Sequence, residues 1–94
     1  MNGGIPLTAK PRLHHKARLR YDRRTQHVWL LYPERGLEMN RTAAEIARLC
    51  TGEHTVDAII RQLVGNHPDA SADAIGKQVV HFLAILACRG LLLD

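Results

Sequence analysis

The sequence predicts an α+β domain in which a three-stranded antiparallel meander is followed by three helices. The first observation behind this prediction is a change of period. Apolar residues alternate with polar ones from Ala17 to Asp22, and β-forming residues dominate positions 26–32, whereas from Asn40 apolar residues recur every three or four positions. The second is that short groups of turn-forming residues separate the early apolar runs, which favours antiparallel neighbours. The 94 residues are enough for one such domain.

Three strands are predicted before Asn40. Residues 17–22 alternate Ala, Leu and Tyr with Arg, Arg and Asp, as in a strand with one side in water. Residues 26–32 are rich in β-forming residues and apolar on both faces. Residues 33–36, Pro-Glu-Arg-Gly, are typical of a turn. The third strand is therefore short and covers residues 37–39.

Residues 1–16 contain Gly and Pro with little periodicity, which predicts a flexible N-terminal tail. The folded domain is then expected to span residues 17–94. Residues 1–24 carry seven Lys and Arg against one Asp, in a chain whose formal net charge is +4. Such a basic segment favours nucleic acid, an acidic peptide or an acidic protein surface as a partner, or is simply a solvated strand face.

The first two predicted helices have clear ends. Asn40 is a good N-cap for the first, and Gly52 is a typical stop. Thr55 caps the second, and residues 65–68, Gly-Asn-His-Pro, end it.

The third helix carries more apolar surface than a core contact requires. It is expected to begin at Asp69 or Ser71 and to end at about Arg89, before Gly90. On a helical wheel its apolar arc covers roughly 220°, against a stripe of about 100° for a typical core-facing helix. Either this helix is central in the fold, or part of the arc borders a groove for a partner. The arc is formed by Ile75, Val79, Val80, Phe82, Leu83, Ile85, Leu86 and Ala87.

The third strand is predicted to be an edge that another chain can extend. The first strand carries Arg18 and Arg20, which discourage pairing between edges. By contrast, Leu37, Glu38 and Met39 carry one charge and no proline, and they lead straight into a helix. A short unprotected edge beside an apolar helix is a site for adding a peptide strand. The alternatives are that the protein's own tail covers this edge, or that a second copy does so in a homodimer.

The sequence holds no catalytic or metal-binding motif, so we expect a protein that is not an enzyme and needs no cofactor. The six His residues include no pair three or four positions apart on one helix. Ser71, the only serine, is assigned to a helix cap. Cys50 and Cys88 lack a Cys-x-x-Cys motif and are predicted to fill the core. No apolar run approaches the roughly 20 residues of a membrane span, and residues 1–6 lack a secretory layout, so we expect a cytoplasmic protein without a membrane partner.

Several segments together carry a resemblance to a known family. They are residues 21–22, 28–36, 39–43, 49–56 and 89–92. The most distinctive are Leu-Leu-Tyr-Pro-Glu in the turn region and Asn-x-Thr-Ala followed by Leu-Cys-x-Gly-x-x-Thr-Val. Through their order and spacing, residues 11–94 resemble the PqqD family of peptide carriers in pyrroloquinoline quinone (PQQ) biosynthesis. One departure is Arg35 before Gly36, which lengthens the turn and shifts the expected start of the third strand by a residue.

The resemblance implies a winged-helix-like domain of the kind called a RiPP recognition element. Members of this family bind the ribosomal precursor peptide PqqA as an extra strand beside the third strand and against the third helix. They present it to PqqE, the radical SAM enzyme that crosslinks Glu and Tyr side chains of the peptide and that supplies the iron–sulfur chemistry. On this chain the peptide-binding edge maps to Leu37, Glu38 and Met39, and the helical wheel indicates Ile75, Val79 and Leu83 as the helix wall.

Two further expectations concern partners. Arg18 and Arg20 are predicted to meet an acidic surface of the partner enzyme. We also expect Leu83→Asp, or the replacement of Met39 with Pro, to weaken peptide binding without abolishing the fold.

The alternative function is a winged-helix DNA-binding protein, which the architecture and positive charge permit. Nucleic acid is the less favoured partner because a recognition helix would offer few basic or amide side chains, namely Arg61 and Gln62, or Lys77, Gln78 and Arg89.

Overall fold

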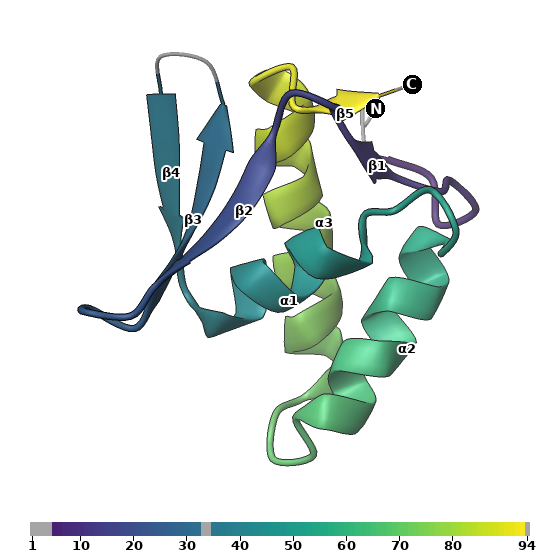
Figure 1. Cartoon of the computed structure of the whole chain (residues 1–94). Helices are drawn as coiled ribbons and strands as arrows, with labels where there is room; N and C mark the ends of the chain where they lie inside the picture. The colour runs from purple at the N-terminus through teal and green to yellow at the C-terminus, as the bar shows by residue number, and fades with distance from the viewer. Residues whose placement is uncertain (1–4, 33–34, 94) are drawn as a thin grey trace.

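The computed structural model describes residues 5–32 and 35–93, which form a small sheet beside three helices (Figure 1). The predicted α+β class is confirmed, since three antiparallel strands precede the helices along the chain. A second pairing, between two very short strands near the ends of the described chain, was not predicted. In chain order the elements are β1 (Arg12–Leu13), β2 (Arg18–Asp22), β3 (His27–Tyr32), β4 (Arg35–Met39), α1 (Arg41–Leu49), α2 (Val56–Asn66), α3 (Ala72–Cys88) and β5 (Leu92–Leu93).

The strands β2, β3 and β4 form the predicted meander, with β3 in the middle. In this register Leu30 of β3 lies opposite Leu19 of β2 and Leu37 of β4. The strand β4 starts earlier than predicted, because Arg35 and Gly36, expected in the turn, already pair with β3. The rest of the predicted turn lies outside the described residues.

The helices begin at predicted caps. The side-chain oxygens of Asn40, Thr55 and Ser71 each accept a hydrogen bond from the backbone N–H three residues later, at 2.8, 3.0 and 3.1 Å. Of the two candidates for α3, Ser71 is therefore the cap. Gly52 and Gly90 have φ values of +85° and +72°, a conformation that glycine adopts without the steric cost of a side chain.

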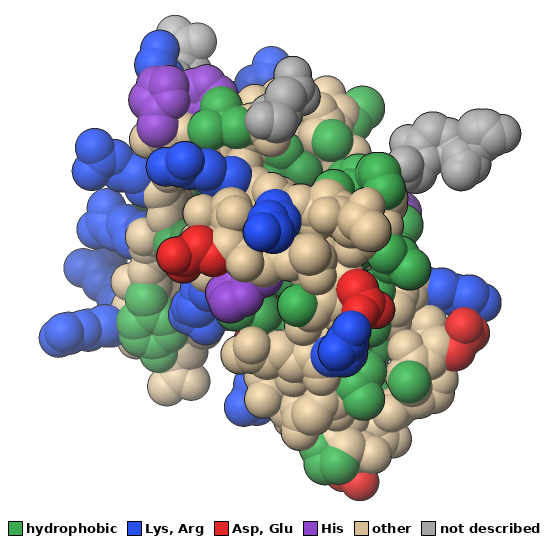
Figure 2. Space-filling model, turned by 90° about the vertical axis from the view of Figure 1, so that its right-hand side faces the viewer, with side chains coloured by type: hydrophobic (Ala, Val, Ile, Leu, Met, Phe, Trp, Pro, Cys, Tyr) green, Lys and Arg blue, Asp and Glu red, His purple; other side chains and the backbone are tan. Residues whose placement is uncertain are grey.

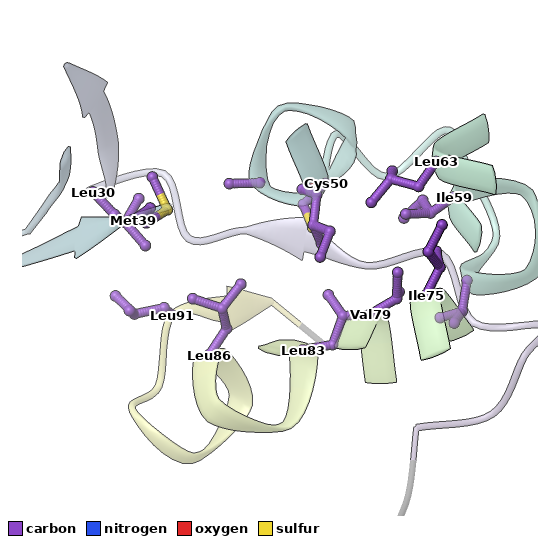
Figure 3. Packing of buried hydrophobic residues seen from close by; sticks show 13 residues of the cluster. Leu30, Met39, Cys50, Ile59, Leu63, Ile75, Val79, Leu83, Leu86 and Leu91 are labelled. Carbon is purple, nitrogen blue, oxygen red and sulfur yellow. The ribbon is translucent and has the colours of Figure 1, made fainter. Parts of the chain in front are cut away.

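One hydrophobic core lies where the helices meet the inner face of the sheet. Leu30, in the middle of β3, is fully buried, and all three helices contribute side chains to the same cluster. Figure 3 shows Ile75, Val79 and Leu83 pointing from α3 into the space they share with side chains of α2. The middle of the apolar arc of α3 therefore faces the core. This agrees with the first interpretation of the arc, in which the helix is central in the fold.

Residues 5–13 differ from the expected tail of residues 1–16, because they make backbone hydrogen bonds to the helical part of the chain. The strand β1 pairs antiparallel with β5. The N–H groups of Gly52 and Val56 donate to carbonyl oxygens of this segment at 3.0 and 2.9 Å. These amides, before and at the start of α2, have no partner within a helix, so the segment satisfies donors that would otherwise need one. Residues 1–4 of the predicted tail lie outside the described residues.

Candidate functional site

The strand β4 is an edge of the sheet, and no other described strand pairs with its outer side. Along an antiparallel strand, backbone groups alternate between those that bond to the neighbour and those that point away from it. Tyr32 and Arg35 pair across a two-residue connection, and residues that flank such a connection bond to each other. The outward-directed groups of β4 are therefore those of Gly36 and Glu38.

The three predicted edge residues all lie in β4, with different surroundings. Met39 is 4% exposed, and Leu37 is partly buried against the same core. Glu38 is exposed and forms an ion pair with His27 on the other face of the sheet. An incoming strand would meet the backbone at this edge, while the side chains of Leu37 and Met39 hold β4 on the core.

The three residues predicted for the helix wall point into the core instead. Ile75, Val79 and Leu83 are 3, 0 and 0% exposed, so they leave no surface for a peptide to cover. They occupy the middle of the apolar arc, which is the strip that the sheet and the other helices bury. The apolar area that α3 leaves exposed therefore lies on the flanks of the arc.

The flank that borders the sheet contains Gln78, Phe82 and Ile85, which form one stripe with Arg89 at helical spacing. Contacts fix both ends of this stripe. The Arg89 guanidinium donates to the Tyr32 hydroxyl oxygen, at the end of β3, over 3.3 Å. Gln78 and Phe82 line a hollow of about 240 Å³ together with the first turns of α1, immediately after β4. Phe82 and Ile85 are partly buried and keep area that a partner can cover.

Phe82 and Ile85 belong to the apolar arc predicted from sequence but not to the predicted helix wall. The one sequence feature that points to them is that Ile85 extends the arc on one side only. A helical wheel gives the angle between residues and does not show which flank faces the sheet. Only the contacts of Arg89 and Gln78 with other elements decide this.

Arg18 and Arg20 lie away from the free edge of β4. Both are exposed on β2, at the opposite edge of the sheet, and they lie opposite Leu31 and Trp29 of β3. These four side chains share the face of the sheet that is turned away from the core. The predicted basic surface is present, and it has an apolar centre that the charge pattern did not indicate.

No group of three or more His, Cys, Asp or Glu side chains within residues 5–32 and 35–93 could hold a metal ion. None of the helices in the described ranges has the length and apolar character needed to cross a membrane. Glu45 and His67 approach to 2.6 Å where α1 meets the end of α2, which joins those two helices.

The two cysteines, both expected in the core, have different environments. Cys50 is 3% exposed, and its Sγ donates to the Ile46 carbonyl oxygen over 3.3 Å. Burial raises the pKa of the Cys50 thiol from 9.0 to about 12, because the thiolate would lose its hydration. Cys88, at the end of α3, is exposed.

We expect a thiol reagent at pH 8 to modify Cys88 in the native protein and Cys50 only after unfolding. With a pKa of about 12, only about one Cys50 thiol in ten thousand is ionised at that pH, and the side chain is also enclosed. Counting modified thiols by absorbance before and after adding guanidinium chloride tests this. Two thiols that react rapidly without denaturant would contradict it.

Known proteins resemble this chain over nearly its whole length. The family model for coenzyme PQQ synthesis protein D (PqqD) matches residues 27–92. A protein named PqqA binding protein, from Rhodopseudomonas palustris (strain BisB5), is 40% identical over 90 residues, which cover 96% of this chain and 87% of that protein. The bifunctional coenzyme PQQ synthesis protein C/D of Methylorubrum extorquens (strain AM1) is 37% identical over 83 residues, or 87% of this chain and 22% of that protein.

A solved structure has the same fold. It is the solution NMR structure of the PqqD truncation of Methylobacterium extorquens PqqCD, described as a functional, stand-alone RiPP recognition element. The TM-score is 0.73 at 33% identity, with 89% of this chain and 88% of the other covered. The PqqA binding protein and the RiPP recognition element are named for binding and recognition. The family model, the sequence identities and the shared fold together show that this chain belongs to the PqqD family.

Proposed function

We propose that this protein binds the ribosomal precursor peptide PqqA of PQQ biosynthesis by strand addition and presents it to the radical SAM enzyme PqqE. The observation that carries the proposal is the unpaired edge of β4, together with a partly apolar flank of α3 that contacts the end of β3 and the first turns of α1, the helix that follows β4. The relatives named PqqA binding protein and the RiPP recognition element structure support a peptide as the ligand. The role is one of recognition, with the chemistry left to the enzyme.

In this proposal the peptide runs along β4 and bonds to the outward backbone groups of Gly36 and Glu38. Its side chains alternate between two directions, as in any strand. One set points toward α3 and meets Phe82 and Ile85. Ile75, Val79 and Leu83 act from behind, by holding α3 in the hydrophobic core that it shares with the other helices.

Energetics require both surfaces. Pairing five or six peptide residues gives a few hydrogen bonds, each worth about 0.5–1.5 kcal/mol net. Ordering each of those residues costs about 1–2 kcal/mol. Backbone pairing alone therefore does not hold the peptide. Apolar contact with the α3 flank, at roughly 25 cal/mol per Å² buried, supplies the difference.

A domain that delivers a peptide must also meet the enzyme that uses it. In one relative, the matching domain occupies 22% of a longer, bifunctional PQQ synthesis protein. This arrangement supports the view that the domain acts next to an enzyme. Arg18 and Arg20 lie on the opposite edge strand from the proposed peptide site, so an enzyme that bound there would leave β4 open. A second copy of the chain is the competing occupant of β4, and sedimentation velocity across a concentration series would detect it.

An NMR titration of labelled protein with synthetic PqqA tests the peptide site. We expect the largest amide shifts at residues 36–40 and along α3 between Gln78 and Arg89. Ile85→Asp should weaken binding about five- to tenfold, because it removes a partly buried apolar contact and adds a charge. Ala84→Asp, one position along on the exposed side of α3, is the matched control and should bind within twofold. Shifts confined to α2 or β2 would contradict the proposed site.

A further inference from the structure

The outer face of the sheet, turned away from the core, carries an apolar pair that no described element covers. Leu30 of β3 is fully buried in the core, so its neighbours Trp29 and Leu31 project from the opposite face. Both are partly exposed. In soluble proteins, an aromatic side chain grouped with other apolar side chains on an open face commonly marks an interface.

Gly36 gives this apolar pair its shape. A Cβ atom at position 36 would lie 3.3 Å from Cδ2 of Leu31 and 3.4 Å from Cε3 of Trp29. The two side chains therefore lean over the backbone of β4, in space that a larger residue at position 36 would crowd. On the other side of the pair, a hollow of about 660 Å³ extends toward the β2–β3 hairpin and is lined by Trp29, Leu31 and Arg20 together with Arg23 and Arg24 of the hairpin.

Positive charge surrounds the apolar pair. Arg18 and Arg20 lie beside it on β2, and Arg23 and Arg24 follow in the hairpin. Two carboxylates also lie nearby, and the four arginines outnumber them. Asp22 lines the same hollow and accepts a hydrogen bond from the Arg24 backbone N–H at 2.9 Å, and Glu38 pairs with His27. Figure 2 shows Lys and Arg side chains gathered in a column along one side of the molecule, with hydrophobic groups among them.

We infer that this outer face, with Trp29 and Leu31 at its centre and the four arginines around them, docks an acidic protein surface that inserts an apolar side chain. Aromatic and arginine side chains dominate the energetics of protein interfaces, and opposite charge selects the partner and speeds its encounter. The inference rests on the proposed function, because it takes the acidic partner to be the enzyme that receives the peptide.

The peptide itself enlarges this face. A strand added to β4 continues the pleat of the sheet, so alternate peptide side chains fall on the outer face beside Gly36 and Glu38. A partner docked over Trp29 then contacts protein and peptide at once. The peptide and the enzyme thereby strengthen each other's binding to this protein by the same factor, as thermodynamic linkage requires.

Calorimetry with purified PqqE, with and without saturating PqqA, tests the inference. The wild-type protein should bind the enzyme at least fivefold more tightly when the peptide is present. Trp29→Ala should weaken enzyme binding about 30-fold or more, and Arg20→Glu about tenfold at low salt. Arg48→Glu makes the same charge change on α1, on the opposite side of the sheet, and should stay within twofold. Each variant should bind PqqA within threefold of the wild type.

The outcomes separate this inference from the proposed function. If Trp29→Ala and Arg20→Glu bind PqqE as the wild type does, the outer face is not the docking surface, whatever the peptide titration shows. If the wild type does not bind PqqE, both the outer-face inference and the presentation step of the proposed function are wrong. If the wild type does not bind PqqA, the proposed function itself is wrong. Because Arg20 is exposed, its variant keeps the test valid even if circular dichroism shows that Trp29→Ala perturbs the sheet.

Discussion

Replacing Glu38 with proline is expected to weaken PqqA binding about 10- to 100-fold while the domain stays folded. Glu38 directs its backbone groups away from β3, so proline removes a donor at the free edge and none from the existing ladder. The lost hydrogen bond leaves a peptide carbonyl without its partner, a cost of about 1–3 kcal/mol. The proline ring also obstructs the approaching strand.

Glu38→Ala is the matched control for this experiment. It removes the same side chain and the same ion pair with His27, but it keeps the backbone N–H. We expect it to bind the peptide within about threefold of the wild type, since exposed ion pairs contribute little to stability. Isothermal titration of both variants distinguishes backbone recognition from side-chain recognition. Equal affinities in the two variants would show that the peptide does not pair with β4.

Leu83→Asp is expected to prevent folding, which corrects the milder effect expected from sequence. Leu83 is fully enclosed in α3. Removing a buried Leu side chain costs about 2–5 kcal/mol, and burying an unpaired carboxylate adds several more. A domain of this size has only about 5–15 kcal/mol of stability. Any loss of peptide binding in this variant would therefore report unfolding and not a missing contact.

Thermal unfolding followed by circular dichroism tests this prediction. The wild type should show a cooperative transition, and Leu83→Asp should show none. Ala84→Asp places the same carboxylate one residue along α3, at an exposed position, and should keep the transition within a few degrees. A folded Leu83→Asp protein would mean that the core around α3 is looser than its burial indicates.

The sequence by itself determined the elements and their order. The strand patterns before Asn40 and the helical spacing after it are local, because a helix bonds to itself and a meander pairs strands that are adjacent in sequence. The caps at Asn40, Thr55 and Ser71 are equally local, because each bonds to an amide three residues away. The edge position of β4 also followed from sequence, since short connections leave few ways to order three strands.

Only the tertiary structure decided which surfaces remain available. The apolar arc of α3 was wide enough for either a core or a groove, and packing buried its middle while it left Phe82 and Ile85 at the flank. The same long-range packing placed residues 5–13 against the helical part of the chain. No local pattern predicts these contacts or the pairing of β1 with β5. It also left Trp29 on an uncovered face. Burial depends on what lies opposite a side chain in space, and a periodic pattern gives only its direction along one element.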